Sequence, residues 1–343
     1  MKTALFGLTK TEIEAIVAAE NFPKYVAGQI IDWLYKKDIR SIDEMTNLSK
    51  SIRSILNEKY IMGLSEFIKV SESADGTKKY LFPTTVGGFI EAAYIPDNER
   101  ATLCVSSQVG CKMGCVFCMT AKQGFQGQLT VTEILNQIKS LPERAGLTNV
   151  VYMGMGEPFD NIDAVLKSIE ILTADYGYAW SPKRITVSTI GVIPAMKRFL
   201  EESKAHLAVS LHSPFEADRR VLMPIETKYP LKAVLTEIRN WDFGRQRRVS
   251  FEYIMFKDFN DTPAHAKELI RLLNGIKSRI NLIRFHPIPG ITLQSSSDDN
   301  ILKFQELLKS KGIITTLRAS RGQDIDAACG LLSTKELVKK KSE

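Results

Sequence analysis

Two hydrophobic patterns alternate along the chain from residue 101 onward. Short, nearly continuous apolar runs are followed by longer segments in which apolar residues recur every three to four positions. The short runs predict strands of a parallel sheet covered on both faces, and the longer segments predict crossover helices. The predicted strand–helix pairs are 101–107 with 130–141, 149–154 with 162–174, 184–189 with 192–202, 206–211 with 231–241, 249–256 with 264–275, and 279–285 with 300–310, and a possible seventh strand is 314–319.

The residues before this alternation follow other patterns. Three stretches of helical periodicity predict a small helical accessory domain over residues 1–65. A β-hairpin with Asp75-Gly76 at its turn and a further strand are predicted over 66–98, which links the helices to a core over 99–343. No G-x-G-x-x-G follows the first core strand, so this α/β pattern favours a partial (βα)6 barrel over a dinucleotide-binding sheet. The predicted helices of the accessory domain are 9–19, 24–37 and 49–60.

The residues with unusual chemistry each follow a predicted strand of the core. In barrels of parallel strands, active sites are built at the C-terminal strand ends. We therefore expect these segments to meet on one face, although they are far apart in the sequence. In strand order they are the cysteine-rich CKMGCVFC (111–118), GMGEP (154–158), STIG (188–191), SLHSP (210–214), FKDFND (256–261) and FHPIPG (285–290).

Composition adds few constraints. The 343 residues are 44% hydrophobic and 25% charged, which is typical of a soluble protein with a sizeable core. No apolar run approaches the roughly 20 residues of a membrane helix, and the N-terminal stretch shows no export signal, so we expect a cytoplasmic protein without membrane association. The net charge of +7 permits a nucleic-acid partner but does not identify one.

Three of the five cysteines form the pattern C-x3-C-x2-C at Cys111, Cys115 and Cys118. In a reducing compartment, clustered cysteines bind metal more often than they form disulfides. Three sites compete: a structural zinc site with Cys104 as fourth ligand, a [4Fe–4S] cluster with four cysteines, and a [4Fe–4S] cluster on three thiolates with one open iron. No second ligand pair follows, and Cys104 lies inside a predicted strand, so the spacing favours the open cluster. Phe117 and Phe125 are expected to screen it from water.

This cysteine pattern after the first strand of a (βα)6 alternation resembles the radical S-adenosylmethionine (SAM) superfamily. In that superfamily the open iron chelates the amino and carboxylate groups of SAM. The reduced cluster then cleaves SAM to a 5′-deoxyadenosyl radical. The resemblance therefore implies a radical SAM barrel that uses a [4Fe–4S] cluster with three Cys ligands and SAM on the fourth iron.

Further stretches extend the resemblance over nearly the whole chain. CVSSQVGCKMGCVFCMTAKQGF, GMGEP, STIGV, SLHSP, DAACGLL and EMTNLSK resemble the RlmN family of dual-specificity 23S rRNA and tRNA adenine-C2 methyltransferases. The resemblance implies formation of 2-methyladenosine in 23S rRNA and in tRNA, at the adenosine 3′ of the anticodon. One alternative is the related Cfr chemistry at C8, although TAKQGF and the proline of GMGEP are more similar to RlmN. The alternative of another class is a non-catalytic, zinc-stabilised RNA-binding module.

The resemblance also implies roles for residues that are unremarkable on their own. Cys329 is methylated by one SAM and then loses a hydrogen atom, and the resulting methylene radical adds to the electron-poor adenine carbon. Cys104 resolves the adduct and forms a transient disulfide with Cys329. Glu91 accepts the C2 proton. It stands among apolar residues, which raise the pKa of a carboxyl, as suits a general base.

Seven residues correspond to SAM-contacting positions of the family. Glycine permits close backbone approach, and a carboxylate is suited to the SAM ammonium or a ribose hydroxyl. At His286 the chain departs from the family pattern, which has Asn there. A backbone contact tolerates that change, whereas a side-chain amide contact does not. The seven are Gly156, Glu157, Ser188, Ser210, Leu211, His212 and His286.

The resemblance implies partners as well. The N-terminal helices are expected to grip RNA, with arginines of the core as phosphate contacts. A low-potential electron donor such as flavodoxin is expected to reduce the cluster, and the chain is expected to be a monomer. The arginines considered for phosphate contact are Arg219, Arg220, Arg245, Arg247 and Arg248.

Overall fold

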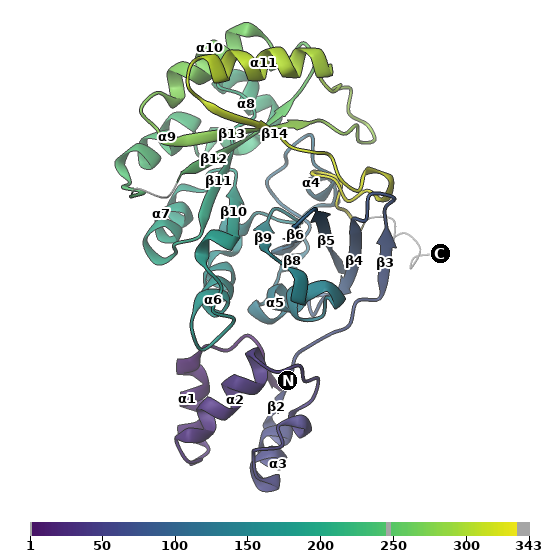
Figure 1. Cartoon of the computed structure of the whole chain (residues 1–343), viewed down its shortest axis with the longest axis vertical. Helices are drawn as coiled ribbons and strands as arrows, with labels where there is room; N and C mark the ends of the chain where they lie inside the picture. Colours follow the sequence, from purple (N-terminus) through teal and green to yellow (C-terminus); the bar gives the residue numbers. More distant parts are fainter. Residues whose placement is uncertain (1, 245–247, 335–343) are drawn as a thin grey trace.

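The computed structural model describes residues 2–244 and 248–334, and its core is one mixed sheet of ten strands (Figure 1). The strand order is β14-β13-β12-β11-β10-β9-β6-β5-β4-β3, with all pairs from β6 to β14 parallel. The six predicted core strands and the possible seventh are confirmed. They are β6 (Arg100–Val105), β9 (Asn149–Tyr152), β10 (Ile185–Thr189), β11 (His206–Ser210), β12 (Val249–Met255), β13 (Ser278–Arg284) and β14 (Ile314–Leu317).

The crossover helices follow these strands along the outside of the curved sheet, as Figure 1 shows for α7, α9, α10 and α11. Their apolar faces and the strands make one continuous core, and every residue of β12 is buried. The barrel is partial because β14 and β3 remain edges. The crossover helices are α5 (Val131–Lys139), α6 (Ile162–Thr173), α7 (Ile193–Glu202), α9 (Leu231–Asn240), α10 (Pro263–Leu273) and α11 (Asp298–Ser310).

The predicted hairpin and the strand after it join the barrel sheet rather than forming a separate layer. β5 pairs antiparallel with β6, β4 with β5, and β3 with β4. The hairpin turn is where the sequence predicts it, and the side chain of Asp75 accepts a hydrogen bond from the Thr77 amide. These strands therefore extend the barrel edge beside the first core strand. Their bounds are β3 (Lys69–Glu72), β4 (Lys78–Pro83) and β5 (Phe89–Asp97).

Three helices precede the sheet and pack at one end of the barrel (Figure 1). Thr9 caps the first of them through a capping box with Glu12. Asn136 of α5 exchanges hydrogen bonds with Ser65, and Glu12 pairs with Lys167 of α6 at 2.6 Å. The helices are thus fixed to α5 and α6. They are α1 (Lys10–Ala19), α2 (Tyr25–Tyr35) and α3 (Lys50–Lys59), and a short parallel pair joins β1 (Thr3–Ala4) to β2 (Tyr60–Ile61).

One arginine expected at the surface is inside the protein. Arg219, on α8 (Glu216–Leu222), is fully buried and pairs with the buried Glu226. The prediction that Arg219 contacts RNA phosphate is therefore wrong, because its guanidinium faces the interior. Arg220 beside it is exposed. Arg245 and Arg247 lie outside the described residues, whereas Arg248 is partly buried.

The helices of the described ranges are all too short or too polar to cross a membrane. This agrees with the absence of a long apolar run in the sequence.

Candidate active site

A cavity of about 150 Å³ opens at the C-terminal ends of the core strands. The cysteine loop lines it together with the segments that follow β9, β10 and β11, as the strand-end argument predicts. Among the predicted site residues, those that line it are Cys111, Cys115, Cys118, Gly156, Glu157, Ser188, Ser210, His212 and Cys329.

The segments after β12 and β13 do not line this cavity, but they lie on the same face, as predicted, because Phe256 and Phe285 pack in one buried cluster with Cys115 and Phe117 of the cysteine loop. In the 256–261 segment, Asn260 turns inward because its amide satisfies buried backbone groups. It accepts a hydrogen bond from the Phe256 amide at 2.7 Å and donates to the carbonyl oxygen of His212 at 2.6 Å. This loop supports the cavity wall from behind. His286, after β13, lines a neighbouring cavity, and its Nδ1 lies 3.0 Å from the side-chain nitrogen Nε2 of Gln323.

The cysteine loop is held in shape by glycine and by a short strand pair. β7 (Gln108–Val109) pairs antiparallel with β8 (Gly127–Gln128) across the base of the loop. Gly110 has a φ of +71°, and a Cβ there would lie 1.6 Å from the Gly124 carbonyl oxygen. Only glycine fits this crossing. The loop ends where Cys118 begins the short helix α4 (Met119–Gln123).

The three loop thiols fit a cluster better than a closed zinc site. Within 2–244 and 248–334, no three Cys, His, Asp or Glu side chains converge closely enough to bind one metal ion. Structural zinc needs four ligands around a single ion, whereas each thiolate of an iron–sulfur cluster binds a different iron. Cys104, considered as a fourth zinc ligand, lines the neighbouring cavity and not that of Cys111 and Cys115. The donor set therefore matches a cluster held by three cysteines.

Burial controls the protonation of these thiols. It raises the pKa of Cys111 to about 12 and raises the pKa of Cys115 as well. Thiols in such surroundings would lose their protons to a bound metal, so holding a cluster here would release protons. Phe117 is buried and lines the cavity, as expected for a screening residue. Phe125 is 40% exposed beneath Lys112, so its predicted screening role is wrong.

Glu157 is a fully buried carboxyl on the cavity wall. Burial raises its pKa to about 7, while backbone amides of Ile190 and Phe159, each 3.1 Å from an oxygen, oppose that rise. The preceding Gly156 has a φ of +99°, and a Cβ there would lie 2.5 Å from the Gln108 side chain. Gln108 in turn accepts a hydrogen bond from the Glu157 amide at 2.8 Å. The glycine is thus required to bring Glu157 into the site.

His212 is held as a neutral ring in a left-handed backbone conformation, with a φ of +54°. Burial, and then the nearby Arg219, lower its pKa to about 3. Its Nδ1 accepts a hydrogen bond from the Ile254 amide at 3.0 Å, so the remaining proton is on Nε2. Leu211 beside it is buried outside the cavity, and its carbonyl accepts a hydrogen bond from Arg219. A neutral histidine does not repel a cationic ligand.

A second cavity of about 140 Å³ adjoins the first. Cys104 lines it, and Cys329 lines both cavities. Burial raises the pKa of Cys104 to about 12, the neighbouring Cys329 raises it further, and Arg318 lowers it. Arg318 also lines both cavities and lies 3.4 Å from the carboxylate of Glu252. Arg318 was not predicted from the sequence, although it follows the last core strand directly.

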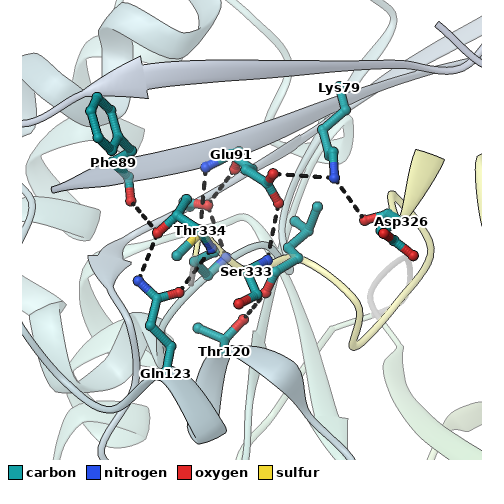
Figure 2. Close-up of polar contacts among 11 residues, drawn as sticks. Lys79, Phe89, Glu91, Thr120, Gln123, Asp326, Ser333 and Thr334 are labelled. Carbon is teal, nitrogen blue, oxygen red and sulfur yellow. Dashed lines mark hydrogen bonds and ion pairs between the residues drawn. The ribbon is translucent and has the colours of Figure 1, made fainter. Parts of the chain in front are cut away.

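Glu91 lies next to Ser333, a few residues after Cys329 in the C-terminal segment (Figure 2). It lines neither of these two cavities, and its carboxylate accepts a hydrogen bond from the Ser333 amide at 3.0 Å. Burial raises its pKa, and Lys79, 3.1 Å away, lowers it. Thr120 and Gln123 of α4 hold the same segment through hydrogen bonds to Leu332 and Thr334, and neither was predicted from the sequence.

Comparisons with known proteins agree with this geometry. Residues 105–273 match the family model of the radical SAM superfamily, and residues 3–62 match that of the ribosomal RNA large subunit methyltransferase N-terminal domain. A Bacteroides fragilis protein described as a probable dual-specificity RNA methyltransferase RlmN is 55% identical over 97% of both chains. A Syntrophus aciditrophicus protein described as a dual-specificity RNA methyltransferase RlmN is 43% identical over 96% of both chains.

A solved structure shares the whole architecture. The crystal structure of a radical SAM methyltransferase from Sphaerobacter thermophilus has a TM-score of 0.90 and 39% identity. The match covers 96% of this chain and 99% of that one. The helical N-terminus, the added strands and the barrel therefore occur together in a known methyltransferase.

Proposed function

The chain belongs to the RlmN family of radical SAM methyltransferases, and we propose that it methylates C2 of adenosine in RNA. Its proposed substrates are 23S rRNA and tRNA, the latter at the adenosine 3′ of the anticodon. The relatives' names as dual-specificity RNA methyltransferases support an RNA substrate. The single observation that carries the proposal is that Cys329 lines both the cavity of the cluster cysteines and the cavity of Cys104.

The enzyme uses a [4Fe–4S] cluster and SAM, which together supply a carbon radical able to remove hydrogen from a methyl group. We propose that Cys111, Cys115 and Cys118 hold the cluster. Glu157 is suited to accept hydrogen bonds from the N–H groups of the SAM amino group, since its carboxylate lies on the wall of the cavity that the cysteine loop lines. The remaining proposed SAM contacts are Gly156, Ser188, Ser210, Leu211, His212 and His286. Of these, Leu211 is buried outside the first cavity with its backbone groups bonded to Glu252 and Arg219, and His286 lines the second cavity.

The two cavities separate the two tasks of Cys329. Toward the first cavity, its sulfur takes a methyl group from one SAM, and the methyl then loses a hydrogen atom. Toward the second cavity, the resulting methylene carbon bonds to C2 of adenine. The C2 proton passes to the proposed base, and one electron leaves the radical adduct for an acceptor such as the oxidised cluster. The Cys104 thiolate then bonds to the sulfur of Cys329 while the S–CH₂ bond breaks, and the released carbon takes up a proton to become the methyl group. Both thiols of this pair are free in the structure. The disulfide is proposed as a transient product that an external reductant must cleave.

Glu91 is the proposed acceptor of the C2 proton. A buried carboxyl with a raised pKa is a stronger base than one in water, provided that it is ionised at the operating pH. Its contact with the Ser333 amide places it next to the segment that carries Cys329. The carboxylate and the thiol are thereby linked by a few residues of chain.

The partners follow from the same proposal. The helices over residues 1–65 are proposed to grip RNA, with Arg220 among the exposed cations of the core that contact phosphate. We further propose a low-potential electron donor such as flavodoxin, a monomeric enzyme and a cytoplasmic location. The match of residues 3–62 to a ribosomal RNA methyltransferase domain supports the role of the helices.

The test is nucleoside analysis after turnover. The purified protein is reconstituted anaerobically with iron and sulfide and incubated with a 23S rRNA fragment or tRNA, SAM and a reductant. Mass spectrometry is expected to detect 2-methyladenosine in both RNAs. A product methylated at C8 contradicts the assignment of C2, and unmodified RNA contradicts the proposed activity as a whole.

A further inference from the structure

The strand register places a lysine beside the proposed proton acceptor. Lys79 of β4 is opposite Ala93 of β5, and Ala93 is opposite Cys104 of β6. Residues opposite each other in an antiparallel pair share a face, and so do residues two positions apart on one strand. Glu91 is two residues before Ala93. Lys79, Glu91 and Cys104 therefore share one face of the sheet.

Lys79 connects Glu91 to the C-terminal segment. Its Nζ lies 3.1 Å from Glu91 Oε1 and 3.3 Å from the carbonyl oxygen of Asp326. The other carboxylate oxygen of Glu91 accepts a hydrogen bond from the Ser333 backbone amide. Figure 2 shows the ammonium between the carboxylate and Asp326, a few residues before Cys329 in the chain. One cation thus holds both the carboxylate and the segment that bears the methyl-carrying thiol.

The surroundings make this cation decisive for the charge of Glu91. Burial is the largest influence and raises the pKa of Glu91, and the carboxylate of Asp326 raises it further. Lys79 opposes both through its charge and its hydrogen bond. The neighbours Ser106 and Met155 are uncharged and contact only the Glu91 backbone. The side chain of Lys79 is only 14% exposed, so water screens the pair weakly.

We propose that Lys79 is a positioning residue for methyl transfer, which keeps Glu91 ionised and aligned with the Cys329 segment. This inference rests on the proposed role of Glu91 as the acceptor of the C2 proton. A neutral carboxylic acid is not a base, so losing the cation disables the acceptor, while the side chains proposed to hold the cluster and the thiols of Cys104 and Cys329 stay in the chain. The proton itself moves from C2 to a Glu91 oxygen, and Lys79 neither gains nor loses one.

The test compares Lys79→Met, Lys79→Arg and Lys78→Met. Lys78 is the matched control because it precedes Lys79 on β4, belongs to the other face, and pairs with Glu143 at 3.0 Å. RNA methylation is measured across pH, and methylation of Cys329 and SAM cleavage are measured in parallel. In Lys79→Met we expect RNA methylation near pH 7 to fall roughly tenfold or more, with the acid limb of the profile at higher pH. In Lys79→Arg and Lys78→Met, the acid limb of the pH profile is expected to lie at the same pH as in the wild type.

The outcomes separate this inference from the proposed function. The same pH profile in Lys79→Met as in the wild type overturns the inference, and so does a loss that is equal at every pH, since that indicates a structural role only. Intact SAM cleavage in Lys79→Met shows that the variant is folded. A Glu91→Gln variant that methylates RNA normally contradicts the role of Glu91 instead. If Glu91→Gln loses RNA methylation while Lys79→Met keeps the wild-type pH profile, the role of Glu91 stands and only the positioning role of Lys79 is contradicted.

Discussion

Cys104 on β6 and Cys329 in the C-terminal segment line the same cavity, although one belongs to the first core strand and the other follows the last. Cys104 is buried and Cys329 is exposed. Arg318 lines the same cavity and lowers the pKa of the Cys104 thiol against the effect of burial. This arrangement permits the exposed thiol of Cys329 to form a covalent adduct with the substrate and the buried thiol of Cys104 to react with that adduct afterwards.

Replacing Cys329 separates radical generation from methyl transfer. Cys329→Ala removes the sulfur that we propose as the methyl acceptor but leaves Cys111, Cys115 and Cys118 in place. We expect RNA methylation to fall below detection while 5′-deoxyadenosine still forms from SAM. Iron content and 5′-deoxyadenosine yield serve as the controls for an intact cluster. Normal RNA methylation by this variant would falsify the carrier role.

Replacing Cys104 is expected to stop the reaction one step later. Without its sulfur the S–CH₂ bond of the adduct has no attacking thiol, so RNA remains attached to Cys329. A covalent protein–RNA species is expected on denaturing gels, and mass spectrometry of the digest is expected to place the link at Cys329. Recovery of free RNA alone after turnover argues against a resolving role for Cys104.

SAM binding is expected to depend on pH through Glu157. Its pKa is raised to about 7 by burial, so the ionised fraction of this carboxyl falls as pH drops through neutrality. The SAM sulfonium and amino N–H groups favour the ionised form, so affinity is expected to weaken by up to about tenfold per pH unit below pH 7. Binding is measured by calorimetry on the cluster-loaded protein. Glu157→Gln is expected to bind more weakly and without this pH dependence, and an identical pH profile in both proteins contradicts the assignment.

The buried Arg219 is expected to stabilise the fold around the site. It pairs with Glu226 and donates to the carbonyl oxygens of Ile190 and Ser210, which tie the ends of β10 and β11 together. Arg219→Met leaves a buried carboxylate unpaired and is expected to cost about 3–5 kcal/mol of unfolding free energy. The exposed neighbour Arg220 provides the control, because Arg220→Met is expected to change it by less than about 0.5 kcal/mol. Equal urea midpoints for the two variants contradict this account.

The barrel was predictable because its strands and helices carry strong, different periodicities. The meeting of the cysteine loop, Glu157 and His212 at one cavity was predictable because parallel strands bring their C-terminal ends to one edge. Their roles toward a cluster and SAM stay predictions. The 256–261 loop reaches the same face but does not line the cavity, because the Asn260 amide satisfies buried backbone groups rather than facing a ligand.

Other features depend on contacts that no local pattern encodes. Arg219 was expected at the surface because buried arginines are rare, and its partner Glu226 is in a separate short helix. Lys79 was missed because its proximity to Glu91 follows from the register between two strands. Cys329 has no periodicity around it, so only the folded chain shows that it borders two cavities.

The central claim is that the methyl group reaches RNA through Cys329. Its most direct test uses SAM whose methyl group carries three deuterium atoms. Transfer through a methylene carbon on sulfur removes one of them, so the account predicts 2-methyladenosine with two deuterium atoms in the new methyl group, read by mass spectrometry after a single turnover of the reconstituted enzyme. A product that retains all three would show direct transfer from SAM and would contradict the role of Cys329.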